Sequence, residues 1–137
     1  MKYVLDTNAV SALMKGDEKV TRRLAQKPRA DVYLPQPVLA EIAYGIERLS
    51  RSRRRDGLRM RFDLIRQELT RAPWSDDVSE AFGAIKAKLE RAGQRIDDFD
   101  IAVAAHAAAM AAVLVTANLG HMSRIPDIEI EDWENEP

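Results

Sequence analysis

Tyr3-Val4-Leu5-Asp6-Thr7-Asn8, near the start of the chain, sets the expected fold. Three apolar residues in a row indicate a short buried strand, and the acid Asp6 follows where that strand ends. Burying an ionised carboxylate costs free energy unless another group compensates its charge. In an open parallel sheet, the carboxyl ends of the strands are also where ligands bind. The opening run therefore predicts an α/β protein with a carboxylate site at one edge of its sheet.

Apolar periodicity along the rest of the chain alternates between strands and helices. Strands are expected at residues 2–5, 31–34, 113–116 and 128–131. Helices are expected at about residues 8–15, 17–27, 37–49, 58–69, 75–93 and 97–112. The arginine-rich segment around Gly57 is expected to be a loop before the fourth helix. This order predicts one α/β domain over residues 1–137, with three layers and a central parallel sheet of about four or five strands flanked by helices.

The composition restricts the kind of metal site that the chain can build. At 137 residues, 46% of them hydrophobic, the length and composition suit a single globular domain. There is no cysteine, so any metal is held by oxygen or by the only two histidines, His106 and His121. Carboxylate oxygen favours Mg²⁺ or Mn²⁺. No segment approaches a signal-peptide core or a transmembrane helix in length, which predicts a cytoplasmic protein without a membrane partner.

The charges are segregated although the net charge is only −1. Nine arginines lie between Arg48 and Arg71, against three acids, and six acids but no basic residue lie from Asp127 onward. A basic block on a near-neutral chain favours a local anionic partner. A solvated helix–loop–helix surface explains the same block equally well, so charge alone does not decide between the two.

Three further polar residues are expected at the same sheet edge as Asp6. Glu41 lies about one turn into the helix after the second strand, Asp100 begins the helix before the third strand, and Asn118 follows the third strand. The carboxyl ends of parallel strands share one edge, so these side chains can converge. Gly45 lies one turn beyond Glu41 and leaves that stripe of the helix open.

Each acid also has a structural interpretation. Asp6 can cap the first helix, and for Asp6 alone this interpretation has equal weight. Asp97 and Asp100 have the spacing of a capping box, and Asp97 and Asp98 are best interpreted as acids that favour a helix start. Glu41 is harder to explain in this way, because its neighbours are mostly apolar or small.

The cost of gathering these acids favours a bound cation. Three carboxylates about 5 Å apart repel one another by roughly 3 kcal/mol per pair at an effective dielectric constant near 20. A small domain has only about 5–15 kcal/mol of total stability. A metal ion is the simplest compensation at neutral pH.

Four segments, in this order, resemble the acidic motifs of PIN-domain ribonucleases. They are Leu5-Asp6-Thr7-Asn8, Leu39-Ala40-Glu41-Ile42 with Gly45, Phe99-Asp100-Ile101-Ala102-Val103-Ala104-Ala105-His106-Ala107, and Leu114-Val115-Thr116-Ala117-Asn118. The closing stretch Pro126-Asp127-Ile128-Glu129-Ile130-Glu131-Asp132-Trp133 is similar to the ending of VapC-type toxins. The resemblance spans essentially the whole chain.

The resemblance implies a three-layer PIN-like fold and a Mg²⁺- or Mn²⁺-dependent endoribonuclease. Such an enzyme is the toxin of a type II toxin–antitoxin pair and cuts a tRNA or another structured RNA. It implies a homodimer, neutralised by a VapB-like antitoxin whose C-terminal segment lies across the active-site groove. By carry-over, the catalytic and metal-binding acids are Asp6, Glu41 and Asp100.

The chain departs from many PIN domains at Asn118, where a fourth acid is common. Asn118 contributes no charge to a second metal site, but it can orient a metal-bound water, and Asp97 is a candidate to substitute in part. The arginines expected to contact RNA or the antitoxin are Arg51, Arg53, Arg54 and Arg55.

The expected chemistry is hydrolysis by metal-activated water, which leaves 5′-phosphate and 3′-hydroxyl ends. The rival ribonuclease chemistry uses the RNA 2′-hydroxyl and two histidines. His106 lies among alanines and suits packing or a dimer contact, whereas His121 lies in a polar loop that can meet phosphate. Two other classes stay open: a non-catalytic RNA- or protein-binding module whose acids cap helices, and a metal-dependent nuclease acting on DNA.

Overall fold

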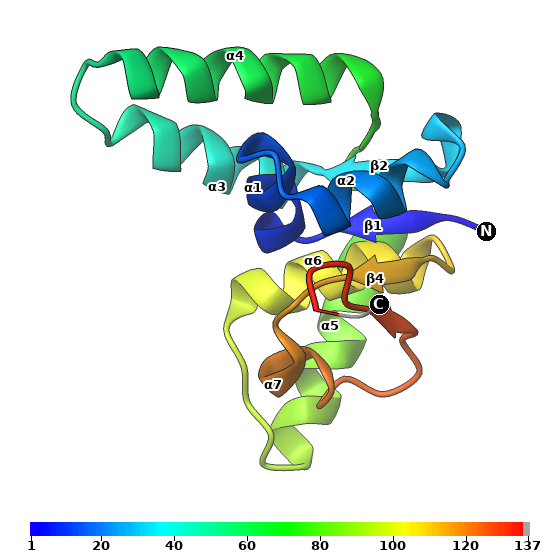
Figure 1. Cartoon of the computed structure of the whole chain (residues 1–137). Helices are drawn as coiled ribbons and strands as arrows, with labels where there is room; N and C mark the ends of the chain where they lie inside the picture. Colours follow the sequence, from blue (N-terminus) through cyan, green and yellow to red (C-terminus); the bar gives the residue numbers. More distant parts are fainter. Residues whose placement is uncertain (136–137) are drawn as a thin grey trace.

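A five-stranded parallel sheet forms the centre of the protein (Figure 1). The structure is a computed structural model, and it describes residues 1–135. The strands run in the order β3-β2-β1-β4-β5, and every neighbouring pair is parallel. They are β1 (Tyr3–Leu5), β2 (Val32–Pro35), β3 (Thr70–Ala72), β4 (Val113–Val115) and β5 (Ile130–Glu131). The expected α/β fold with a parallel central sheet is confirmed.

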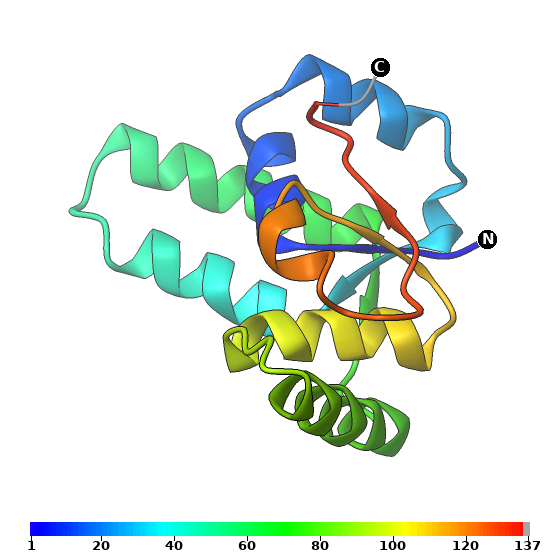
Figure 2. The same ribbon diagram turned by 90° about the horizontal axis from the view of Figure 1, so that it is seen from below.

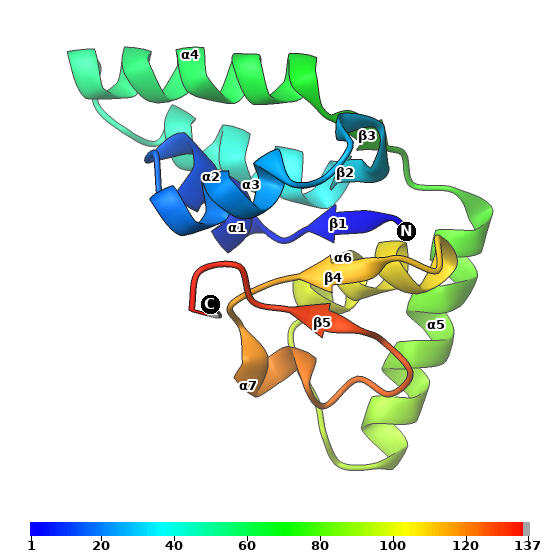
Figure 3. The ribbon, with the colours of Figure 1, turned by 45° about the vertical axis from the view of Figure 1, so that its right-hand side comes forward.

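Helices cover both faces of this sheet. Their bounds are α1 (Thr7–Met14), α2 (Glu18–Ala25), α3 (Gln36–Glu47), α4 (Arg53–Glu68), α5 (Asp76–Arg91), α6 (Asp98–Ala109) and α7 (Leu119–Met122), with a short 3₁₀ turn at Arg29–Asp31. Figure 1 shows α3 and α4 as an antiparallel pair that projects beyond the sheet. Figure 2 shows α5 packed along α6, and Figure 3 shows the strands lying side by side. None of the helices within residues 1–135 combines the length and apolarity that a membrane crossing requires.

The two central strands are hydrophobic throughout because both of their faces are covered. Every residue of β1 and β4 is buried, and Leu5 and Leu114 are fully so. Near the C-terminus, Trp133 is also buried and stacks at a tilt against Tyr3, with 5.8 Å between the ring centroids. Its Nε1 donates to Glu131 Oε1 at 2.9 Å, which fastens the last segment onto the β5 edge.

Two predicted helix ends are confirmed by their backbone conformation. Gly16 and Gly93 have φ of 77° and 67°, the left-handed region that glycine enters without steric cost. In each case the next residue donates its N–H to a carbonyl five positions back, Asp17 to Ala12 and Gln94 to Leu89, both at 2.9 Å. This pair of features closes the last turn of a helix.

Two predicted boundaries are wrong. The sixth helix ends at Ala109 rather than near residue 112, because Ala111 takes a left-handed φ of 51° and Ala112 N–H donates to Ala107 O at 2.9 Å. Alanine at this position gives no sequence signal for a helix end. The arginine-rich segment is not a loop up to Gly57, because Ser52 Oγ accepts from Arg55 N–H and starts α4 at Arg53.

The smallest elements also differ from expectation. The edge strand β3 was not expected, because it has three residues of which only Ala72 is buried. The other edge strand, β5, is shorter than residues 128–131, although Leu114 N–H still donates to Glu129 O at 2.8 Å. The four-residue helix α7 lies in a segment that was expected to be a loop.

The strand order reverses between β1 and β4, and the carboxyl end of the sheet at this reversal is the place that open α/β folds use as a crevice. The chain proceeds outward from β1 to β2 and β3, then returns to place β4 on the opposite side of β1. Asp6 N–H donates to Val115 O at 2.9 Å, so the residues leaving these two strands lie next to each other. Such a reversal of strand order is where open α/β sheets bind ligands.

Candidate active site

Asp6 stands at the carboxyl end of β1 and at the start of α1. Only 3% of it is exposed. One carboxylate oxygen, Oδ1, accepts from Thr7 N–H at 2.7 Å, and the other, Oδ2, accepts from Thr116 Oγ1 at 2.8 Å and from Asn8 Nδ2 at 3.3 Å. The helix-capping interpretation of Asp6 is therefore confirmed. The cap also places this carboxylate in the crevice between β1 and β4.

The surroundings of Asp6 disfavour its charge. Burial raises the pKa of Asp6, and the negative charge of Asp100 raises it further, against the hydrogen bonds from Thr116, Thr7 and Asn8. A cation close to this carboxylate therefore stabilises its charged form.

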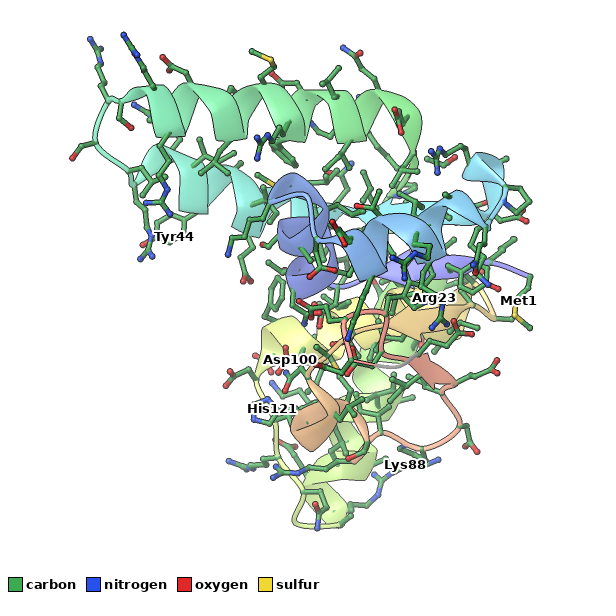
Figure 4. All side chains as sticks on the ribbon, in the orientation of Figure 1. Met1, Arg23, Tyr44, Lys88, Asp100 and His121 are labelled. Atoms are coloured by element: carbon green, nitrogen blue, oxygen red, sulfur yellow. The ribbon has the colours of Figure 1, made fainter. Side chains whose placement is uncertain are left out.

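Asp100 is the second buried acid, in the first turn of α6. It is 8% exposed, and its Oδ2 lies 2.8 Å from His121 Nδ1 and 3.4 Å from Asn118 Nδ2. A carboxylate can only accept, so the imidazole Nδ1–H donates. Figure 4 labels Asp100 and His121, which meet between α6 and α7. Asn118 is the N-cap residue of α7 and His121 lies within this helix, so α7 positions one oxygen of Asp100.

His121 was expected as a loop residue that can meet phosphate, and not as a partner of Asp100. A sequence signal for this position exists, because His121 lies three positions after Asn118, and side chains at this spacing meet on one face of a helix. Because a loop and not a helix was expected at this position, the helical spacing was not recognised. Thr116 was missed as well, although its hydroxyl links Asp6 to Asn118 N–H, from which it accepts at 3.0 Å.

Glu41 lies on the exposed side of α3. Burial of its carboxyl group against neighbouring atoms raises its pKa, and the charges of Asp6 and Asp100 raise it further. The three acids are therefore electrostatically coupled although they come from three different helices or helix starts. The charges of Asp6 and Asp100 thus act on Glu41, but the convergence of Asp6, Glu41 and Asp100 at one metal site stays a prediction.

A groove with a volume of about 520 Å³ leads away from Glu41 between α1, α3 and α4. Its lining includes Thr7, Lys15, Tyr44, Gly45, Arg48 and Leu58. Because Thr7 follows Asp6 directly, the groove begins beside the acid cluster and continues along α3.

The remaining predicted residues lie outside this cluster. Asp97 is exposed at the N-cap position of α6 but makes no capping hydrogen bond with its side chain, so that part of the capping expectation is wrong. Asp98 is also exposed and pairs with Lys86 at 2.9 Å. The four arginines Arg51, Arg53, Arg54 and Arg55 lie at the connection of α3 and α4.

His106 is fully buried, which agrees with the packing interpretation. Its Nδ1 lies 2.8 Å from Ala102 O, and its ring meets the edge of Trp74 with 5.5 Å between centroids. Burial lowers the pKa of His106 and favours the neutral imidazole. Because His106 cannot reach a substrate, the chain lacks the second accessible histidine that two-histidine chemistry needs.

The donor set of the cluster fits a hard divalent cation. Asp6 and Asp100 supply carboxylate oxygens, and a positive charge relieves the repulsion that raises the pKa of Asp6 and Glu41. Within residues 1–135, no three aspartate, glutamate or histidine side chains are grouped closely enough to hold an ion by themselves. Mg²⁺ commonly binds one or two carboxylates and keeps several waters.

Comparisons with known proteins agree with this geometry. The sequence profile of the PIN domain family matches residues 3–127. Over 136 residues, the chain is 30% identical to Ribonuclease VapC2 of Rickettsia felis, covering 98% of this chain and 99% of that protein. It is 28% identical to the tRNA(fMet)-specific endonuclease VapC of Salmonella typhimurium, covering 97% of this chain and 98% of that protein.

A solved structure has nearly the same fold. This is the crystal structure of VapBC2 from Rickettsia felis bound to a DNA fragment from their promoter. One of its chains matches with a TM-score of 0.87 and 28% identity, covering 97% of this chain and 99% of that chain.

Replacing Asp6 by asparagine is expected to stabilise the metal-free protein at pH 8, by on the order of 1 kcal/mol, the usual scale of one substitution. The folded-state pKa of Asp6 is raised, so wild-type stability falls as pH rises through that pKa, and Asp6→Asn loses this dependence. Asparagine caps helices as well as aspartate does. Urea unfolding in EDTA at pH 4 and pH 8 measures the effect.

The matched control is Asp17→Asn, at the cap of α2, for which little change is expected. If Asp6→Asn leaves the free energy of unfolding unchanged at both pH values, as expected for Asp17→Asn, Asp6 is chiefly a cap.

Proposed function

The chain belongs to the PIN domain family, and we propose that it is a divalent-metal-dependent endoribonuclease, the toxin of a toxin–antitoxin pair. The observation that carries the proposal is the pair of buried carboxylates, Asp6 and Asp100, where the strand order reverses. The names of the relatives that match over almost the whole chain support the same activity. Metal-dependent nuclease chemistry explains why two carboxylates are buried together despite the cost in folding free energy, whereas a binding module does not.

In the proposed mechanism, Asp6 and Asp100 would hold the ion, with Mg²⁺ as the first candidate and Mn²⁺ as the second. When bound, such an ion supplies a Lewis acid at the scissile phosphate and makes a nearby water more acidic. Glu41, exposed and with a raised pKa, takes the proton of the attacking water. Asn118 and His121 keep Asp100 in place. Attack by water leaves 5′-phosphate and 3′-hydroxyl ends.

The proposed substrate is a tRNA or another structured RNA, as in the relative named for tRNA(fMet). The proposed partner is a VapB-like antitoxin, since the solved relative is a VapBC complex. A homodimer is proposed from the resemblance to VapC-type toxins, and light scattering of the purified protein tests it. Asp97 stays a candidate for a weak auxiliary metal contact.

Purified protein free of antitoxin is expected to cut total RNA into discrete fragments in Mg²⁺ and to leave it intact in EDTA. Asp6→Asn and Asp100→Asn are expected to lower the rate by about 100-fold or more, since even groups that only support a metal ligand are worth about 10- to 100-fold. Gel electrophoresis and end analysis of the fragments give the rate and the chemistry of the ends.

Asp98→Asn is the matched control, because Asp98 is an exposed acid in the same first turn as Asp100. Fragments that persist in EDTA or in both acid variants contradict the proposal. A folded protein that binds RNA without cutting it indicates the binding module, and preferential cutting of single-stranded DNA indicates a DNA nuclease.

His121→Ala is expected to weaken Mn²⁺ binding by about 10- to 100-fold, because it frees the oxygen of Asp100 that the imidazole holds. His121→Asn should retain most of the affinity, since its amide N–H can donate to the same oxygen. Electron paramagnetic resonance of free Mn²⁺ measures binding without RNA. Equal affinities for wild type and His121→Ala remove His121 from the site.

The arginines divide into two groups in the structure. Arg55 pairs with Glu47 at 2.7 Å, and Arg61 Nη1 donates to Met14 O at 2.7 Å, which ties α4 to α1. Arg51, Arg53 and Arg54 are exposed, and within residues 1–135 they make no ion pair. We propose that these three contact the RNA backbone outside the acid cluster.

Replacing these three arginines together by glutamate is expected to make binding less sensitive to salt. The negative slope of log affinity against log salt should become shallower by about 2, at roughly 0.7 per lost contact. The KM for RNA should rise while kcat in saturating RNA stays the same. Filter binding and cleavage rates across a salt series measure both effects, with Arg91→Glu on α5 as the control. Loss of kcat contradicts a role limited to binding.

A further inference from the structure

The groove beside Glu41 combines an apolar floor with an aromatic rim. Met14, Ile42 and Ile46 line it and are at most 6% exposed. Tyr44, by contrast, is 66% exposed, and Figure 4 shows it projecting outward from α3. An exposed aromatic ring beside an apolar floor suits a planar group that is larger than a single side chain.

Gly45 keeps the middle of this groove open. It lies inside α3, where glycine destabilises a helix relative to alanine. A Cβ built at Gly45 meets no atom within 4 Å, so neither packing nor backbone conformation requires glycine there. A larger side chain at this position therefore fills the groove rather than disturbing the core.

Two cations stand beside the groove. Lys15 comes from the end of α1 and Arg48 from the end of α3, and within residues 1–135 neither makes an ion pair. Arg48 is seven residues beyond Glu41, about 10 Å along the helix axis at 1.5 Å per residue. These charges therefore suit a phosphate that flanks the one at the acid cluster.

We propose that this groove is a subsite for one unpaired nucleotide next to the cleaved phosphodiester, an inference that rests on the proposed function. The base stacks on Tyr44 above the apolar floor, and its phosphate lies between Lys15 and Arg48. Base stacking on an aromatic ring does not depend on base identity, but it requires a base that is not paired in a duplex. The subsite therefore selects unpaired segments of a structured RNA.

The charges favour RNA over a peptide as the occupant. An apolar peptide side chain also fits the floor, but it brings no negative charge to Lys15 and Arg48. A nucleotide satisfies the floor, the ring and the cations together, and it continues directly into the acid cluster.

Fluorescence anisotropy tests the subsite with a labelled oligoadenylate of about 12 nucleotides, within the usual range of site sizes. The protein carries Asp100→Asn, so that the strand is not cut, and a duplex RNA of the same length is the comparison. Tyr44→Ala is expected to weaken single-strand binding by about 5- to 100-fold and to leave duplex binding unchanged. Tyr44→Phe should bind within about twofold of the parent protein, since the ring still stacks.

Gly45→Leu is expected to weaken single-strand binding as much as Tyr44→Ala. Gly83→Leu is the matched control, because Gly83 is also inside a helix and open to solvent but lies outside the groove. Circular dichroism verifies that both variants fold. Arg48→Gln should lower the salt slope by about 0.7.

Single-strand binding that is unchanged in both Tyr44→Ala and Gly45→Leu overturns the subsite. If these variants instead lose only the affinity for a co-expressed antitoxin, the groove is a peptide site and the proposal also fails. Cleavage of total RNA by the wild-type protein in Mg²⁺ distinguishes failure of the subsite from failure of the proposed nuclease function. Cleavage without the binding pattern refutes the subsite alone, whereas a folded protein that does not cut RNA refutes the proposed nuclease and with it a subsite next to a cleaved phosphodiester.

Discussion

The arrangement of the site depends on the burial of two like charges, Asp6 and Asp100, in one crevice. Within residues 1–135, no lysine or arginine side chain is among the hydrogen-bond partners of either acid, and Asp100 pairs with the imidazole of His121. Asp6 is held by hydroxyl, amide and backbone donors, and these leave part of its desolvation cost unpaid. The sheet order imposes this cost, because the reversal between β1 and β4 places the residues leaving both strands side by side. The cost is understandable if the crevice exists to hold a cation.

The helices around the crevice have different tasks. The start of α1 hydrogen-bonds to Asp6, and the short helix α7 holds Asp100 through His121 and Asn118. The pair α3–α4 forms a wall that extends past the sheet, carries Glu41 and encloses the groove (Figure 1). Structural arginines such as Arg61 tie this wall to α1, whereas those at its tip remain exposed. The same basic block thus includes both a structural surface and a candidate RNA contact, which explains why charge alone favoured neither interpretation.

Sequence reasoning succeeded where a residue sits at a fixed distance from a recognisable strand or helix start. Asp6 and Asn118 follow apolar strands, and Asp100 lies in the first turn of a helix, so their neighbourhood followed from topology. It failed where the determining feature is small or conformational. Just after α6, Ala111 adopts a left-handed conformation, and an alanine side chain gives no sequence signal for that conformation. The pairing of His121 with Asp100 was not predicted, because α7 has four residues and no apolar periodicity that would reveal it.

The sequence by itself determined the fold class, the order of the acids along the chain and the hardness of any metal they hold, because hydrophobic period, strand-end position and the absence of cysteine are local properties. Only the tertiary structure decided which partner each acid has, that His106 is sealed in the core while His121 reaches Asp100, and that a groove continues from Glu41 to Arg48. The physical reason is that burial, pKa shifts and grooves arise from atoms that are distant in sequence. Thr116, which donates to Asp6 across 110 positions of the chain, is the clearest case.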